Sequence, residues 1–236
     1  TTQAIVVWTS GARNTLGVKR EDGAQLFSQI VTISNTAIHE IDLRLELLKA
    51  LPGNGSTRTV SLPEPKPDPQ IIDFLKKIPK HFVILNIGAR LIEKQLGPTE
   101  YEQLAFTIQE SGYIPVVTYG PSEQRLAEKV AKQTHSHLAP PTHLLALGYL
   151  MSQSQAVVTC DTGPMHLAVA LQTPTFGIFV STSPERFGYS ISPHFALDSR
   201  QGWNKINLRH LKAWLRNPAD QAETTTLTTN KPPITP

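Results

Sequence analysis

Short, almost uninterrupted apolar runs recur between residues 82 and 180, and each is separated from the next by a segment of helical character. The runs cover residues 82–86, 113–118, 156–160 and 175–180. Continuous hydrophobicity, rather than alternation, is typical of strands that are buried on both faces, as in a parallel sheet whose crossover connections are helices. We therefore expect an α/β fold in which a parallel sheet carries helices on both faces.

The helices that should accompany these strands can be read from apolar spacing and from proline and glycine boundaries. They are expected at residues 70–78, 98–110, 123–132, 141–152, 164–171 and 207–216. Nearer the N-terminus, the apolar run at residues 4–8 predicts a further buried strand, and residues 39–51 predict a helix that ends at the Pro-Gly-Asn-Gly segment 52–55.

Four prolines at alternate positions, Pro63, Pro65, Pro67 and Pro69, predict a stiff extended linker. This linker is the expected domain boundary. The sequence thus divides into a partial N-terminal domain at 1–62, a linker with its first helix at 63–80, a ligand-binding domain at 81–218 and a disordered Thr- and Pro-rich tail at 219–236.

Composition excludes several classes of function. The 236 residues carry a net charge of +3, and Lys or Arg never occurs more than twice in succession, so we expect no nucleic-acid partner. No apolar run is long enough to span a membrane, no signal peptide is visible, and the single Cys160 fits a reducing compartment. We expect a cytoplasmic protein. Because the sequence begins with Thr1 rather than Met, we also expect a fragment or a processed product.

The segment from residue 157 to 179 is apolar except where Asp161, Thr162 and Gly163 interrupt it, with His166 three residues further on. Ligands of doubly wound sheets bind outside the carboxyl ends of the strands, which is where Asp161 should lie. Pro164 suits the first position of a helix, and a helix N-terminus offers unpaired N–H groups and partial positive charge to an anion. Gly163 allows a phosphate to approach the backbone, and His166 reaches the same place from the first turn.

A simpler interpretation competes with this anion site. Thr162 or Gly163 could only cap the helix, with Asp161 assisting, and His166 could be a first-turn residue without a ligand. The spacing alone leaves both interpretations open. The remaining histidines, including His135, His137 and His143, are not joined by Cys or carboxylate residues at ligand spacing, so we expect neither a metal site nor a cofactor.

Several segments resemble the heptosyltransferases of glycosyltransferase family 9. The most specific is "CDTGPMHLAVALQTPTFGIF" followed by "TSPERFG", which is similar to the family's Asp-Thr/Ser-Gly-x-x-His-Leu-Ala pattern and its Phe-Gly-x-Thr-x-Pro loop. The stretch "VILNIGARLIEKQLGP" is similar to a strand and Lys-containing loop, with Lys94 at the Lys position, and "VVTYGPSEQRLAEKVA" is similar to a Gly-Gly-Pro-x-Glu strand end, with Glu123 at the Glu position. The likeness extends over most of residues 4–216.

This resemblance implies a GT-B-like fold with two Rossmann-like domains. The second would bind a nucleotide-activated sugar, typically ADP-heptose, and the first a lipopolysaccharide precursor as acceptor. The sugar would be transferred with inversion and without a bound metal. The donor-binding residues implied together by the pattern and the resemblance are Lys94, Glu123, Asp161, Thr162, Gly163, His166, Thr182 and Arg186.

No catalytic base is assigned, because the family's first-domain segment that supplies acceptor pocket and base has no counterpart in the sequence. We therefore expect part of a heptosyltransferase that binds nucleotide without efficient transfer, at the cytoplasmic face of the inner membrane or in the cytoplasm. The alternative of another class is a non-catalytic nucleotide-sugar-binding remnant. A sugar-nucleotide epimerase of similar architecture suits the segment around Asp161 poorly.

Overall fold

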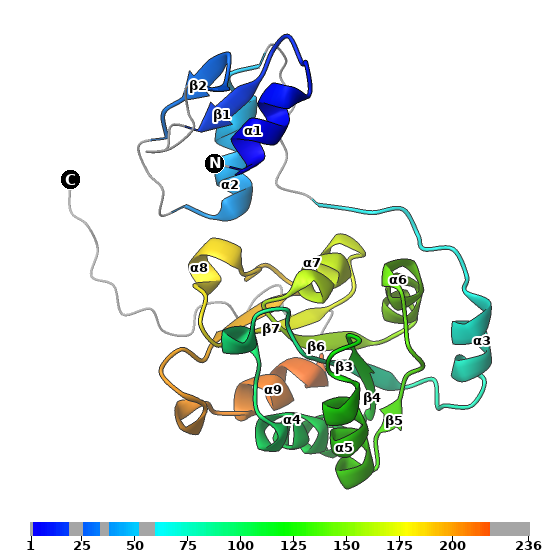
Figure 1. Ribbon diagram of the computed structural model, residues 1–236. Coiled ribbons are helices and arrows are strands. Elements are labelled where there is room, and N and C mark those ends of the chain that lie inside the picture. The colour runs from blue at the N-terminus through cyan, green and yellow to red at the C-terminus, as the bar shows by residue number, and fades with distance from the viewer. Residues whose placement is uncertain (1, 19–25, 34–37, 52–59, 218–236) are drawn as a thin grey trace. The chain divides into compact units, whose positions relative to one another are not determined.

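The computed structural model describes residues 2–18, 26–33, 38–51 and 60–217, which group into two compact units (Figure 1). One unit comprises Thr1–Val60 with Glu185–Phe187, and the other comprises Ser61–Pro184 with Gly188–Pro236. The proline-rich segment therefore groups with the second unit, where the Leu62 N–H donates to the carbonyl of Ala170 at 2.7 Å. The tail expected at 219–236 lies outside the described residues.

The first unit contains α1 (Thr2–Thr9), β1 (Leu16–Val18), β2 (Gln29–Val31) and α2 (Glu40–Leu48). The two strands pair in parallel. The helix expected at 39–51 is confirmed by α2, whose N-terminus is capped by His39: the Nδ1 atom accepts from the Ile41 N–H at 3.1 Å.

The prediction of a strand at residues 4–8 is wrong, because these residues form part of the helix α1. A five-residue apolar run has no period that separates a buried strand from a helix. A strand of this kind also needs neighbours on both sides and cover on both faces, whereas Ile5 and Val6 are 51% and 62% exposed. In the described part of the first unit, sheet pairing involves β1 and β2.

The second unit is built on a six-stranded parallel sheet with the strand order β5-β4-β3-β6-β7-β8. Its strands are β3 (Phe82–Ile87), β4 (Ile114–Tyr119), β5 (His137–Leu138), β6 (Ala156–Cys160), β7 (Thr175–Phe179) and β8 (Phe195–Asp198). The four strands expected from continuous hydrophobicity are confirmed as the four central strands. The two outer strands, β5 and β8, were not expected, because they are short and only partly buried.

Helices cover both faces of this sheet, as Figure 1 shows. They are α3 (Pro69–Leu75), α4 (Pro98–Glu110), α5 (Gln124–Thr134), α6 (Leu144–Ser152), α7 (Gly163–Ala170), α8 (Pro184–Phe187) and α9 (Arg209–Arg216), with short 3₁₀ turns η2 (Ile92–Lys94) and η3 (Trp203–Lys205). Each helix expected in this region is confirmed. Helix α6 begins three residues later than expected, because the His143 side chain caps it by accepting from the Ala146 N–H.

Strand β3 contributes side chains to two hydrophobic clusters, one on each face of the sheet. Val83, Leu85 and Ile87 pack against α4, α5 and α9, whereas Phe82 and Ile84 pack against α3, α6 and α7. The alternation follows from the two-residue period of a strand. All six residues of β3 are buried, as the uninterrupted apolar run predicts.

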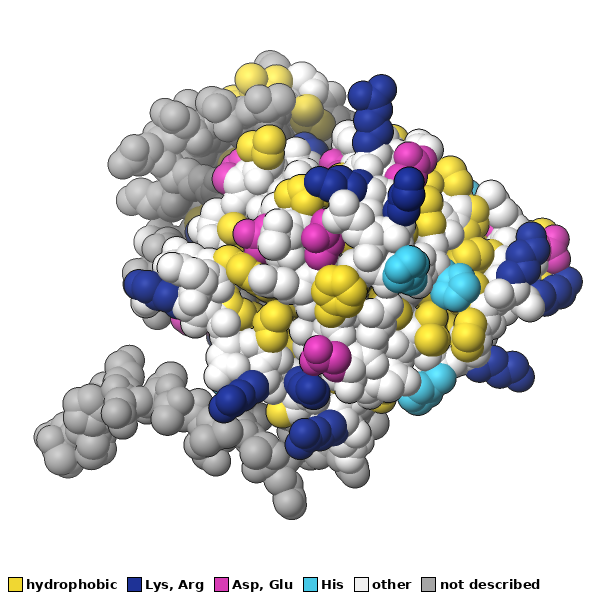
Figure 2. Space-filling model, turned by 90° about the horizontal axis from the view of Figure 1, so that it is seen from below, with side chains coloured by type: hydrophobic (Ala, Val, Ile, Leu, Met, Phe, Trp, Pro, Cys, Tyr) yellow, Lys and Arg dark blue, Asp and Glu magenta, His cyan; other side chains and the backbone are white. Residues whose placement is uncertain are grey.

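On the face shown in Figure 2, basic side chains occur at several separate places with acidic side chains between them. This is the side of the second unit from which α4, α5 and α9 cover the sheet in Figure 1. Within the described ranges, no helix combines the length and hydrophobicity that a membrane crossing requires.

Candidate functional site: the carboxyl edge of strands β3, β4 and β6

The strand order reverses between β3 and β6, since the chain continues from β3 to β4 on one side and returns to β6 on the other. Crevices at such switch points are the usual ligand sites of open parallel sheets. A cavity of about 380 Å³ lies there, lined by the segments that follow β3, β4 and β6 and by the start of α6. Glu123, Thr162 and Gly163, three of the residues expected to bind the donor, line this cavity.

Helix α7 begins at this cavity. Thr162 is its N-cap in extended conformation, but its hydroxyl donates to the Cys160 carbonyl at 3.2 Å, and its side chain makes no capping hydrogen bond to the helix. Pro164 occupies the first turn without an N–H of its own. A Cβ added to Gly163 would meet nothing within 4 Å, so the approach to this helix end is open. The geometry therefore favours an anion site over a helix that is capped by its own side chains.

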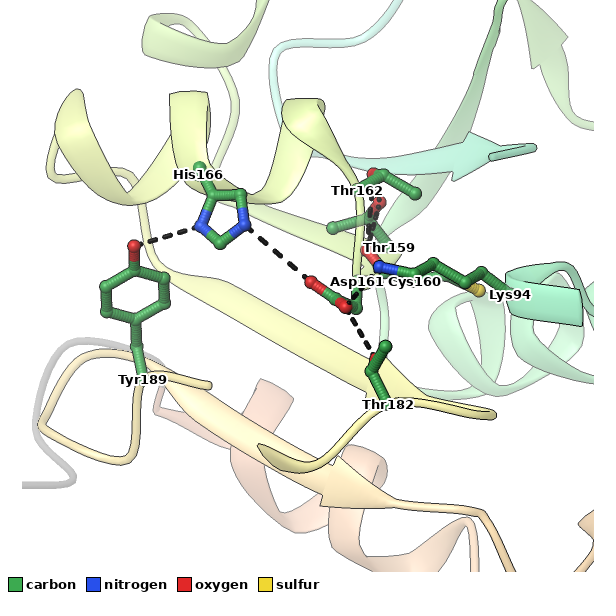
Figure 3. Close-up of polar contacts among 8 residues, drawn as sticks. All are labelled: Lys94, Thr159, Cys160, Asp161, Thr162, His166, Thr182 and Tyr189. Carbon is green, nitrogen blue, oxygen red and sulfur yellow. Dashed lines mark hydrogen bonds and ion pairs between the residues drawn. The ribbon is translucent and has the colours of Figure 1, made fainter. Parts of the chain in front are cut away.

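Lys94, Asp161 and Thr182 come together beside this helix end, from η2, from the end of β6 and from the loop after β7 (Figure 3). One carboxylate oxygen, Oδ2 of Asp161, accepts from Lys94 Nζ at 2.7 Å and from Thr182 Oγ1 at 2.5 Å. The Asp161 side chain is only 4% exposed and that of Lys94 is 22% exposed. A carboxylate this buried requires compensation, and these two donors supply it.

His166 lies in the first turn of α7, between Asp161 and Tyr189 (Figure 3). Its Nε2 atom is 3.7 Å from Asp161 Oδ1, and its Nδ1 atom is 2.9 Å from the Tyr189 hydroxyl. Burial, with a smaller contribution from the Asp161 charge, raises the pKa of Tyr189, so the phenol keeps its proton. The imidazole is thus held from both sides, although its side chain is 43% exposed.

Glu123 is the N-cap residue of α5, and its side chain lies against the backbone of Gly88 and Gly120. A Cβ at Gly88 would lie 2.3 Å from Glu123 Cγ, and the φ of Gly88 is +103°, so both space and conformation require glycine there. The carboxylate oxygen Oε1 accepts from Ser122 Oγ at 2.7 Å and from Gln95 Nε2 at 3.4 Å. Glu123 therefore presents a fixed hydrogen-bond acceptor at the cavity.

A row of buried polar side chains crosses three strands beneath the cavity. Thr118 donates to Asn86 Oδ1 at 3.1 Å, Asn86 Nδ2 donates to Thr159 Oγ1 at 3.2 Å, and the hydroxyls of Thr159 and Thr162 are 3.3 Å apart. The first three side chains are at most 3% exposed. This polar row ties β4, β3 and β6 to the N-cap of α7.

The structure thus brings seven of the eight expected site residues to one edge of the sheet. The eighth, Arg186, lies in α8, with its guanidinium carbon 5.0 Å from the centroid of the Phe187 ring. Its role stays a prediction. Sequence reasoning missed Asn86, a single polar residue within an apolar strand, and Tyr189, which follows the "TSPERFG" stretch directly. In the described residues, no group of three or more His, Cys, Asp or Glu side chains is arranged to hold a metal ion.

The second unit is a doubly wound parallel α/β sheet, with the start of α7 and the Lys94–Asp161 ion pair at its switch point. Proteins of this class usually bind their ligands at that edge of the sheet. Within this class, the sequence model described as glycosyltransferase family 9 (heptosyltransferase) matches residues 3–213. The chain belongs to this family, as the resemblance of its motifs indicates.

Individual relatives agree with this assignment. Lipopolysaccharide heptosyltransferase 3 of Escherichia coli K12 is 30% identical over 108 residues, which is 43% of this chain and 31% of that protein. The chain therefore spans under a third of that relative's length in the match.

Solved structures show the same fold. The family 9 glycosyltransferase of Veillonella parvula has a TM-score of 0.72 at 16% identity, over 90% of this chain and 70% of that one. ADP-heptose lipopolysaccharide heptosyltransferase II of E. coli has a TM-score of 0.70 at 17% identity, over 92% and 73%. The likeness confirms the expected GT-B-like α/β architecture with a parallel sheet flanked by helices.

Proposed function

We propose that the second unit binds a nucleoside diphosphate sugar, ADP-heptose or a close analogue, and that the protein takes part in inverting heptose transfer to a lipopolysaccharide core precursor. The observation that carries the proposal is the junction of an uncapped helix N-terminus with the cavity at the switch point, in a chain of the heptosyltransferase family. The name of the E. coli relative, an ADP-heptose lipopolysaccharide heptosyltransferase, supports the choice of donor and acceptor.

In such a transfer the acceptor oxygen, deprotonated by a base, attacks the anomeric carbon while the bond from that carbon to the diphosphate breaks. The electron pair of the breaking bond stays on the phosphate oxygen, so negative charge grows on the leaving nucleoside diphosphate. In this proposal, the N–H groups at the start of α7 and the ammonium of Lys94 stabilise this charge. The base is not assigned to any residue of this chain.

The contacts of Asp161 and Glu123 support a role for each. Asp161 fixes Lys94 and Thr182 rather than facing the diphosphate, because its Oδ2 already accepts from both. An ammonium has three N–H donors, so the bond to Asp161 uses one of them and orients the Lys94 ammonium toward a phosphate. Glu123, held over Gly88, accepts from ribose hydroxyls of the nucleoside in the cavity.

Isothermal titration of the 236-residue chain with ADP, UDP and GDP tests the donor assignment. We expect ADP to bind, with affinity unchanged by EDTA. Glu123→Gln should weaken binding about five-fold, because an amide oxygen accepts a hydrogen bond less strongly than a carboxylate does. The control is Glu128→Gln, a carboxylate on the same helix that does not line the cavity. Absence of heat with all three nucleotides would contradict the assignment. Turnover of ADP-heptose on a lipopolysaccharide precursor would exclude the non-catalytic remnant, whereas binding of ADP without turnover fits both that remnant and a part of a heptosyltransferase.

A further inference from the structure

We infer that Tyr189 is a positioning residue for His166: its hydroxyl donates to Nδ1 and thereby keeps the imidazole proton on Nε2, where it faces the diphosphate site beside Asp161. The inference rests on the proposed function, because the orientation of His166 matters to a ligand only if the start of α7 binds one. Tyr189 would then act through His166 without touching the donor itself.

The contact geometry carries the first step. Tyr189 lies in the loop between α8 and β8, 23 residues after His166, and its hydroxyl is 2.9 Å from Nδ1 (Figure 3). The two rings meet edge to face, with centroids 5.7 Å apart and planes at 74°. This arrangement suits an in-plane hydrogen bond to the imidazole nitrogen rather than ring stacking.

The opposite side of the imidazole fixes the direction of that bond. Nε2 faces Asp161 Oδ1 at 3.7 Å, and the same carboxylate already accepts from Lys94 and Thr182. A neutral imidazole carries one N–H, and a lone pair on Nε2 would be repelled by a carboxylate. At 3.7 Å the carboxylate favours the proton on Nε2 without fixing it there. The Tyr189 O–H, which donates to the lone pair left on Nδ1, supplies the short contact that holds the proton on Nε2.

The resulting contacts run from Tyr189 through His166 to Asp161. The distance from Nε2 to Oδ1, 3.7 Å, is longer than a hydrogen bond, so Asp161 orients the Nε2–H electrostatically. The exposed part of the His166 side chain allows a ligand to reach it. Without the Tyr189 hydroxyl, the proton would move between the two nitrogens, and Nε2 would present a lone pair to the diphosphate for part of the time.

The test is nitrogen NMR of the full chain labelled with ¹⁵N in its histidine rings, in wild type and in Tyr189→Phe. His166→Gln identifies the His166 signals by their loss. We expect Nδ1 without a proton in the wild type and averaged ring nitrogen shifts in Tyr189→Phe. Titration with ADP should be about three- to ten-fold weaker in Tyr189→Phe, as for loss of one neutral hydrogen bond. Tyr113→Phe is the matched control, because Tyr113 contacts His81 by stacking, with ring centroids 4.3 Å apart.

The two readouts separate the inference from the proposed function. A wild-type spectrum with the proton on His166 Nδ1, or ring nitrogen shifts that Tyr189→Phe leaves unchanged, would overturn the inference. Expected shifts together with no ADP binding by the wild type would support the Tyr189–His166 coupling and overturn the proposed function. If Tyr189→Phe does not fold, a wild-type spectrum with the proton on His166 Nδ1 still overturns the inference, because it reports the proton position directly.

Discussion

Removal of Lys94 should destabilise the fold as well as the site, because Lys94 compensates a buried charge. In Lys94→Met, the Asp161 carboxylate would stay in place at 4% exposure without its 2.7 Å partner. Breaking a buried ion pair by removing one partner costs about 3–5 kcal/mol. Since Thr182 still donates to the carboxylate and Lys94 is itself 22% exposed, we expect a loss below this range, about 2–3 kcal/mol.

Urea unfolding followed by tryptophan fluorescence measures this change, since Trp214 is fully buried and reports on the core of the second unit. The matched control is Lys76→Met, because Lys76 pairs with Asp73 at 2.9 Å but their side chains are 70% and 67% exposed. That variant should unfold like the wild type, because exposed pairs contribute little.

A double variant isolates the buried charge as the cause. Lys94→Met combined with Asp161→Asn should recover part of the loss, since the carboxamide is neutral and still accepts from Thr182. The reasoning would be refuted if Lys94→Met unfolded like Lys76→Met, or if the double variant were less stable than Lys94→Met alone.

Two further predictions concern groups whose pKa is shifted by burial. Burial lowers the pKa of His194 to about 4, and its Nδ1 has no hydrogen-bond partner among the described residues. As the pH drops from 6.5 to 4, the unfolded state takes up a proton on this histidine before the folded state does, so the free energy of unfolding should fall by about 2–3 kcal/mol. Urea unfolding at each pH measures this loss, which should be absent in His194→Phe. Burial raises the pKa of the Cys160 thiol to about 11, so iodoacetamide at pH 8 should label the unfolded but not the folded chain, and mass spectrometry showing rapid native labelling would disprove it.

Much of the second unit could be predicted from sequence, because each central strand is a short apolar run bounded by Gly, Pro or polar residues. Local spacing also placed Asp161, Gly163 and His166 correctly, since a strand end and a helix start are adjacent in the chain. The contact of Lys94 with Asp161 joins residues 67 positions apart and was not predicted; the family resemblance suggested only that both residues belong to the donor site. No sequence pattern indicated Tyr189, because a single tyrosine in a loop belongs to no hydrophobic repeat or motif. The run at 4–8 failed because hydrophobicity alone does not distinguish strand from helix.

The polar row under the cavity determines how the structural effect of one mutation is passed on to the rest of the site. Apolar strands of similar composition could slide past one another at little cost, but displacing Asn86 from Thr118 and Thr159 would leave buried donors and acceptors unsatisfied. The alignment of β3, β4 and β6 is therefore locked at the level of the ligand edge, and Thr162 ends the same row. A change at Asn86, which lines the cavity, should therefore also disturb the start of α7 through Thr159 and Thr162.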